Sequence, residues 1–223
     1  HLTVRCGNIT LIEKSVDQIL KAIQKNNDKG LLAQINKYDK TSYKRVSDSI
    51  VSKTEINEAY MSISKKTLSD LKKAIRNITK FSKNQKLKSW SIKVKGSELG
   101  EKVTPIDRVG IYVPGGKASY PSTVIMNAIP AKIAGVKIIT MVCPPIMGKL
   151  NPVVLVAADL CGINEIYKFG GAHAVGALAY GTKTVKPVDK IVGPGNIYVA
   201  TAKKRVFGTV GIDSFAGPSE VLI

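Results

Sequence analysis

The sequence predicts an α/β protein with a Rossmann-like, mostly parallel sheet and flanking helices, preceded by a helical amino-terminal region. Two observations support this prediction. In residues 1–100 apolar side chains recur at the spacing of amphipathic helices, whereas from residue 109 onward short apolar runs alternate with helical segments. Such alternation with short connections is typical of right-handed crossovers between parallel strands. We therefore expect a helical region over residues 1–108 and a Rossmann-like domain over residues 109–223.

The helical region is expected to contain three helices and a fourth candidate. The first is capped by Asn8 or Thr10, ends near residues 28–30, and carries the stripe Ile12, Val16, Ile19, Leu20 and Ile23. A short second helix follows, with Leu31, Leu32, Ile35 and Tyr38. A longer helix is expected over residues 67–81, after a candidate at 54–63, with the stripe Leu68, Leu71, Ile75, Ile78 and Phe81. We interpret these stripes as the buried faces of the helices, which pack in the core, rather than as binding or catalytic sites.

The hydrophobic pattern changes at residue 90. Residues 90–95 alternate between apolar and polar, and Gly96 and Gly100 mark a turn, so a strand or hairpin is expected near residues 90–105. Further strands are expected at 109–113, 137–142, 165–169 and 190–192. The helices between and after them are expected at 122–134, interrupted at Pro130, and at 152–161, 172–180 and 196–206.

Composition indicates an ordinary globular protein. Hydrophobic residues make up 44% of the 223 positions. Apolar runs of about eighteen residues are absent from the sequence, and the first residues do not resemble a signal peptide, so we expect a cytoplasmic protein with no membrane partner. Residue 1 is not methionine, and residues 220–223 resemble the middle of a buried strand. We therefore expect a fragment of a longer chain.

The net charge of +18 comes mainly from lysines that are scattered over polar helix faces beside many Asn and Ile residues. Because all three residues have AT-rich codons, we favour the base composition of the genome as the cause, and we expect no specific nucleic-acid partner. Non-specific binding to polyanions remains an alternative. Cys6, Cys143 and Cys161 form no CxxC pair and are expected to be small buried thiols.

Glycines cluster directly after three of the expected strands, in residues 112–116, 169–173 and 193–196. Glycine at a strand-to-helix turn lets backbone N–H groups approach a phosphate at a helix amino terminus. A tight turn alone would explain one such loop, but three at one sheet edge favour a nucleotide or anion site. The G-x-G-x-x-G fingerprint is absent from the sequence, so a dinucleotide would have to be held by a different set of loops.

Four stretches together closely resemble the histidinol dehydrogenase family: residues 108–116, 120–131, 193–196 and 216–222. The resemblance extends more loosely over residues 1–100. It implies two successive NAD-dependent oxidations, from L-histidinol through L-histidinaldehyde to L-histidine, which are the last steps of histidine biosynthesis. It also implies a zinc-containing homodimer.

The resemblance assigns roles to particular residues. By motif position Tyr112 and Asn196 are similar to NAD contacts, and Ser219 is similar to a substrate contact. Their chemistry is suitable, since all three side chains can form hydrogen bonds. Three structural alternatives remain open: a tyrosine at the edge of the core, an asparagine that caps a helix, and a serine in a turn.

His173 departs from the family pattern, which usually has a glutamine here as a further NAD contact. An imidazole can replace one hydrogen bond of the amide but not both ends at once. A capping or core histidine is the alternative. A second departure is Ser82, where the family often has histidine; no role depends on it.

The resemblance places the zinc ligands and a Glu-His acid/base pair after the Gly-Pro-Ser-Glu-Val-Leu motif, where this sequence stops. A catalytic zinc needs about three protein ligands. The only histidines are His1 and His173, and no carboxylate cluster lies near either of them in the sequence. We therefore assign no catalytic residue and no metal ligand, and expect this chain alone to be inactive. The alternative function is a catalytically inactive, basic Rossmann-like binding module, such as a decayed gene product.

Overall fold

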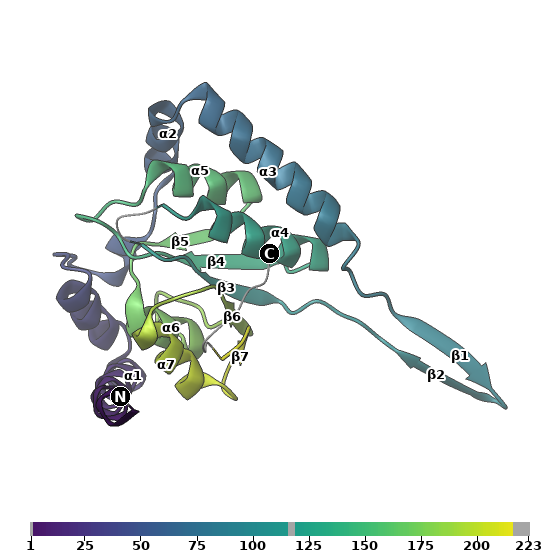
Figure 1. The fold of residues 1–223 in the computed structure, drawn as a ribbon, viewed down its shortest axis with the longest axis horizontal. Helices are drawn as coiled ribbons and strands as arrows, with labels where there is room; N and C mark the ends of the chain where they lie inside the picture. Colours follow the sequence, from purple (N-terminus) through teal and green to yellow (C-terminus); the bar gives the residue numbers. More distant parts are fainter. Residues whose placement is uncertain (1, 116–118, 216–223) are drawn as a thin grey trace.

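A computed structural model describes residues 2–115 and 119–215, and its centre is a five-stranded sheet (Figure 1). All neighbouring strands in it are parallel, and the strand order is β5-β4-β3-β6-β7. The strands are β3 (Arg108–Tyr112), β4 (Ile138–Val142), β5 (Glu165–Tyr167), β6 (Lys190–Val192) and β7 (Gly211–Ile212). The predicted α/β class with a parallel sheet is confirmed. The two-residue strand β7 was not predicted.

Helices cover both faces of the sheet. One face carries α4 (Pro121–Ala134) and α5 (Pro152–Cys161), with α2 (Lys53–Ser62) and α3 (Lys65–Lys83) packed outside them (Figure 1). The other face carries α6 (Gly171–Tyr180) and α7 (Ile197–Val206), against which α1 (Leu2–Tyr38) packs. The short helix η1 (Val46–Ser49) lies between α1 and α2 in the sequence.

The alternation of side chains along β3 produces two hydrophobic cores. Val109 and Ile111 point to the core beneath α4 and α5, whereas Tyr112 belongs to the core beneath α6 and α7. The amino-terminal helices contribute to both, with Val16 of α1 in the second core and Leu71 of α3 in the first. Both cores therefore combine residues from before and after residue 108.

Helix α1 joins the first two predicted helices across a kink. Asn27 has a positive φ of 53° and a ψ of −133°, three residues before the predicted break around Gly30, and the helix begins earlier than either predicted cap. Asparagine tolerates this conformation better than most residues. The Asn27 side-chain oxygen accepts a hydrogen bond of 2.7 Å from the Lys183 N–H, so the kink is held against the loop after α6.

Two details of the predicted helices are wrong. Helix α4 runs through Pro130 without interruption. Proline removes only the helical bond to the carbonyl of Met126, and Met126 lies on the exposed side of α4, where water can replace that bond. In α3, Phe81 is not a core residue, because its side chain is 64% exposed near the end of the helix.

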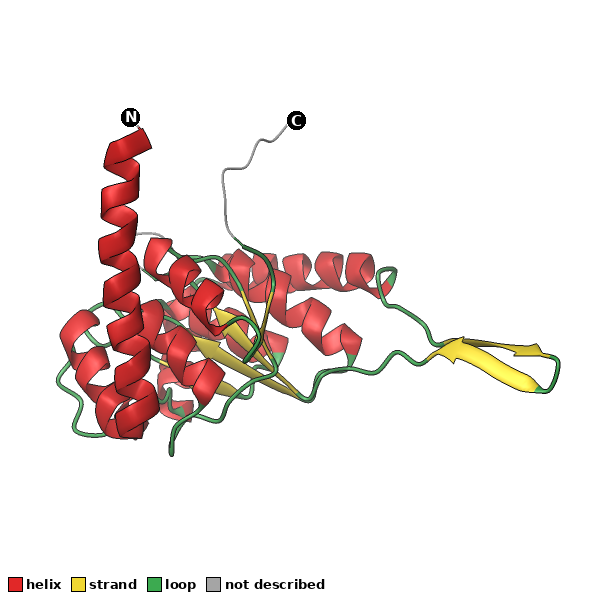
Figure 2. Ribbon diagram, turned by 90° about the horizontal axis from the view of Figure 1, so that it is seen from below, coloured by secondary structure: helices red, strands yellow, loops and turns green. Residues whose placement is uncertain are grey.

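An antiparallel hairpin, β1 (Trp90–Val94) and β2 (Ser97–Glu101), projects away from the body in both views (Figures 1 and 2). All ten residues of its strands are exposed. Trp90, Ile92, Val94 and Leu99 share one face by the strand register. The alternating segment of the sequence therefore forms an amphipathic arm.

Cys143 and Cys161 are buried free thiols, as predicted. Burial and the nearby Asp39 carboxylate raise the pKa of the Cys143 thiol to about 12. Burial raises the pKa of the Cys161 thiol to about 11. The side chain of Cys6 lies outside the described part of the chain.

Within residues 2–115 and 119–215, no helix is both long enough and apolar enough to cross a membrane.

Candidate functional site at the carboxyl edge of the sheet

The strand order reverses direction between β3 and β6. From β3 the chain proceeds through α4 to β4 and β5, and it then returns to β6 on the other side of β3. The loops that leave β3 and β6 therefore diverge, and ligands of open parallel sheets bind in the crevice at such a switch point.

A cavity of about 370 Å³ lies at this point, next to the carboxyl ends of the strands. Its wall includes Tyr112 from the end of β3, His173 from the first turn of α6, and Asn196 just before α7. The three predicted cofactor contacts thus face one cavity. The remaining lining residues are Ser15, Ile19, Tyr38, Asp39, Pro144, Gly171, Ala172 and Tyr198.

Tyr112 is buried, and its hydroxyl accepts a hydrogen bond of 2.9 Å from the N–H of Gly171. Burial raises the pKa of the Tyr112 hydroxyl, the Gly171 bond opposes this rise, and the Asp39 carboxylate adds to it. The hydroxyl stays protonated near neutral pH and retains its own hydrogen for a further bond. Tyr112 therefore links the end of β3 to the start of α6.

His173 is 1% exposed although it lines the cavity. Its Nε2 lies 2.8 Å from Oδ2 of Asp39, whose side chain is only 7% exposed. The Tyr38 ring stacks on the imidazole, with centroids 6.0 Å apart and an interplanar angle of 19°. The histidine is thus both a core residue and part of the cavity wall.

Asn196 caps α7. Its Oδ1 accepts hydrogen bonds of 3.1 Å each from the N–H groups of Tyr198 and Val199. The capping role left open by the sequence is therefore present in the structure. The capping bonds use only the carbonyl oxygen, so the Nδ2 amino group is the part of this side chain that could donate to a ligand.

The glycine loops differ from the sequence-based expectation, because side chains of the protein already bind several of their N–H groups. The Gly170 N–H donates to Asp39 at 3.2 Å, and the Gly193 N–H donates to Asp213 at 2.8 Å. Carboxylates are favoured near helix amino termini for the reason that phosphates are. Asp39 and Asp213 thus occupy positions where the sequence suggested a ligand anion.

A second cavity of about 420 Å³ lies beside the loop before α7. The buried Lys203 donates from Nζ to the Gly193 carbonyl at 2.8 Å and to Asp213. Burial alone would raise the pKa of the Asp213 carboxyl, but hydrogen bonds from Lys203, Ser214 and Gly193 hold it below its usual range. Other lining residues are Asn127, Pro194, Gly195, Val199, Ala200 and Phe215.

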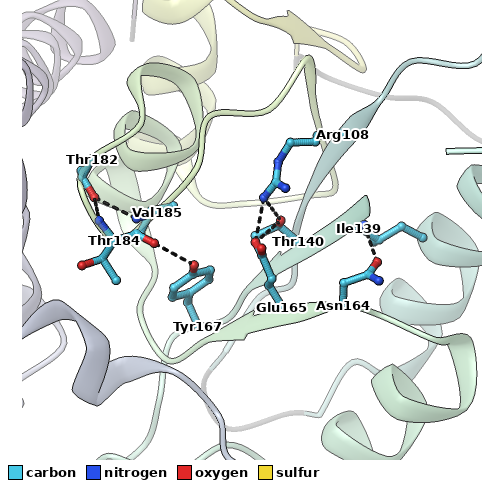
Figure 3. Close-up of polar contacts among 9 residues, drawn as sticks. All are labelled: Arg108, Ile139, Thr140, Asn164, Glu165, Tyr167, Thr182, Thr184 and Val185. Carbon is cyan, nitrogen blue, oxygen red and sulfur yellow. Dashed lines mark hydrogen bonds and ion pairs between the residues drawn. The ribbon is translucent and has the colours of Figure 1, made fainter. Parts of the chain in front are cut away.

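A third polar network, which Figure 3 shows, contains none of the residues that line the two cavities. Arg108, which begins β3, donates to Glu165 at 2.8 Å and to the Thr140 hydroxyl at 3.3 Å, and Thr140 donates to Glu165 at 2.8 Å. Arg108 and Glu165 are the first residues of their strands, so they lie at the amino-terminal edge. This network joins three adjacent strands and is structural.

Comparison with known proteins gives the family. A model of the family described as histidinol dehydrogenase matches residues 5–223. The chain belongs to this family. It is 50% identical over 212 residues to histidinol dehydrogenase of Neisseria meningitidis serogroup B, covering 95% of this chain and 49% of that protein. It is 50% identical over 213 residues to the Geobacter sulfurreducens protein of the same name, covering 95% of this chain and 50% of that protein.

A solved structure agrees with this assignment. The crystal structure of histidinol dehydrogenase from Elizabethkingia anophelis matches with a TM-score of 0.87 and 39% sequence identity. The match covers 93% of this chain and 48% of that chain. The chain thus spans about half the length of the histidinol dehydrogenases that it matches.

The sequence analysis missed six residues that line the 370 Å³ cavity: Ser15, Ile19, Tyr38, Asp39, Pro144 and Tyr198. Tyr38 was assigned to the buried face of a helix, but the residue is 45% exposed. One sequence feature could have indicated Asp39 as a site residue: it is an acidic residue at the end of a lysine-rich helical segment. That signal does not indicate the partner, because His173 lies 134 positions later in the sequence.

Ser219, the substrate contact implied by the histidinol dehydrogenase resemblance, lies outside the described residues. In the part of the chain that the structure describes, no group of three or more His, Cys, Asp or Glu residues could hold a metal ion. The described residues therefore do not fit the zinc site that the resemblance implies.

Proposed function

We propose that this chain forms the NAD-binding part of a histidinol dehydrogenase, which oxidises L-histidinol to L-histidine through L-histidinaldehyde. The observation that carries the proposal is the convergence of Tyr112, His173 and Asn196 on one cavity at the switch point of the sheet. Family membership over residues 5–223 supports it. The reaction belongs to the last steps of histidine biosynthesis.

The residues of the cavity suit part of a dinucleotide. Its volume falls within the range of roughly 300–1,000 Å³ that is common for ligand sites. Tyr198 provides a ring for a planar heterocycle, and the Nδ2 group of Asn196 provides a donor. NAD bound here would supply the acceptor for the hydride that leaves the alcohol.

The other components of the reaction are also proposals. Zinc would be held by residues other than those described, so we derive no step through it. Ser219 would contact L-histidinol. We also propose a cytoplasmic homodimer, supported by the exposed apolar face of the β1-β2 arm, since an isolated two-stranded hairpin is only marginally stable in water.

Calorimetric titration of the chain with NAD tests the proposal. We expect saturable binding that Asn196→Asp weakens about tenfold, because aspartate still caps α7 but replaces the Nδ2 donor with an acceptor. Asn151→Asp is the matched control, since Asn151 caps α5 through the same kind of bond to the Val153 N–H.

Equal NAD affinity of the unaltered chain and Asn196→Asp would contradict the assignment of Asn196. Absence of NAD binding would contradict the proposed function. Binding to polyanions that weakens steeply with salt, without NAD binding, would instead support the basic binding module.

A further inference from the structure

Asp39 is a buried acid that the proposed reaction does not yet use. It follows directly after α1, its side chain is 7% exposed, and it lies against the amino terminus of α6. Its Oδ2 lies 2.8 Å from His173 Nε2 and accepts the Gly170 N–H at 3.2 Å. Both Asp39 and His173 line the 370 Å³ cavity.

The contact with Asp39 determines which imidazole nitrogen carries a proton. An ionised carboxylate can only accept hydrogen bonds, so His173 must hold a proton on Nε2. The Tyr38 ring stacks on the same imidazole and restricts its rotation. Because Nε2 is engaged, Nδ1 is the one nitrogen of the ring that a ligand could use.

Gly171 leaves room beside that nitrogen. This residue has a positive φ of 65°, and a Cβ atom placed on it would lie 3.3 Å from His173 Nδ1. A side chain at position 171 would therefore be strained and would crowd the free edge of the imidazole.

We propose that Asp39 is a positioning residue that holds His173 in the Nε2-protonated form and so presents Nδ1 to the cavity as a hydrogen-bond acceptor. The ligand group at this wall is then a donor, such as an amide, amino or hydroxyl group, and not a phosphate. Insofar as the ligand is NAD, this inference rests on the proposed function.

The electrostatics of the cavity agree with a neutral donor. The Asp39 charge acts on other groups of the site. Burial is the largest cause of the raised pKa of Tyr112 and of Cys143, and the Asp39 carboxylate raises both pKa values further. A phosphate placed against the same wall would be repelled. A glutamine at this position could donate and accept, whereas this histidine, held by Asp39, is restricted in its neutral form to accepting.

The first test does not depend on NAD. Nitrogen-15 spectra of the imidazole in the unaltered chain should show Nε2 protonated and Nδ1 unprotonated. In Asp39→Asn the amide can donate as well as accept, so the fraction with a proton on Nδ1 should rise. Protonation mainly at Nδ1 in the unaltered chain would overturn the proposal.

The second test is a cycle of variants with NAD affinity as the readout. Asp39→Asn should weaken NAD binding about three- to tenfold when His173 is present, and less than about twofold in the His173→Gln background. Asparagine keeps the size of the side chain, and its amide can place either the oxygen or the amino group at the Oδ2 position, which contacts both His173 Nε2 and the Gly170 N–H in the unaltered chain. Asp107→Asn, which removes an exposed acid with a side chain 81% accessible, is the control.

Equal losses of affinity in the two backgrounds would show that Asp39 does not act through His173. If the unaltered chain fails to bind NAD, the proposed function fails, and the nitrogen spectra still decide the role of Asp39. Those spectra require no variant, so the inference stays open to refutation even if Asp39→Asn does not fold.

Discussion

At the residue scale, the Tyr112 hydroxyl is expected to affect stability as well as ligand binding. Tyr112→Phe removes the acceptor of the Gly171 N–H while keeping the ring. A donor left unpaired in a part-buried position costs about 1–3 kcal/mol. We expect the free energy of unfolding in urea to fall by that amount, whereas Tyr120→Phe, at an exposed position, should change it little. An unchanged midpoint for Tyr112→Phe would mean that water replaces the hydroxyl.

A second prediction at this scale concerns pH and Asp213. Its pKa is lowered in the folded chain, so the carboxylate contributes stability above its unfolded pKa near 3.8, and this contribution is lost as pH falls through the lower, folded value. Asp213→Asn should reduce the free energy of unfolding at neutral pH by on the order of 1–2 kcal/mol.

The same variant should lose less stability than the unaltered chain when pH is lowered from about 5 to about 2, because the titrating group is gone. Urea unfolding at a series of pH values measures both effects. Asp107→Asn serves as the exposed control. Parallel pH profiles for Asp213→Asn and the unaltered chain would show that Asp213 does not stabilise the fold through its charge.

At the scale of elements, the β1-β2 arm should be dispensable for the stability of the body. All ten of its strand residues are exposed, and Ser89 already bonds to Val103 across its base at 2.9 Å. Replacing residues 90–101 with an Asn-Gly turn should therefore change the free energy of unfolding by less than about 1 kcal/mol. A larger loss in thermal or urea unfolding would show that the arm supports the body.

The elements that could be predicted from the sequence are those whose pattern is local. The expected helix at 152–161 coincides with α5, because Asn151 caps it, Pro152 begins it, and Gly162 ends it in the left-handed conformation. By contrast, β7 has only two residues and no period to detect. Helix α4 continues through Pro130 because the Met126 carbonyl is on the exposed side of the helix, and the sequence does not reveal that exposure.

The candidate site was predictable only in part, for the same reason. Tyr112 ends a strand, and His173 and Asn196 come after strands, so their place at one sheet edge is a consequence of parallel topology. The contacts that define their chemistry join distant parts of the chain, as Asp39 joins His173. The sequence also could not show that Asp39 and Asp213 bind the N–H groups expected to receive a phosphate.

At the scale of the whole molecule, the amino-terminal helices and the sheet form shared cores, so the cavity depends on both. Ser15, Ile19, Tyr38 and Asp39 reach it from the first forty residues, whereas Tyr112, His173 and Asn196 come from the sheet region. Removal of residues 1–40 should therefore abolish NAD binding together with part of the core around Val16, Ile23 and Leu31. A truncated chain that folds and binds NAD with unchanged affinity would contradict this dependence.

The 223-residue chain alone is expected to bind NAD without oxidising L-histidinol. Hydride transfer from an alcohol requires a base for the hydroxyl proton, and the sequence offers only His1 and His173 as histidines. His173 is buried, and Asp39 engages its Nε2, so we assign it to the cofactor wall rather than to proton transfer. Incubation with L-histidinol, NAD and zinc should give no NADH above a control without the chain. NADH formation that disappears in His173→Gln would instead identify the Asp39-His173 pair as the base, and would place the chemistry at this cavity.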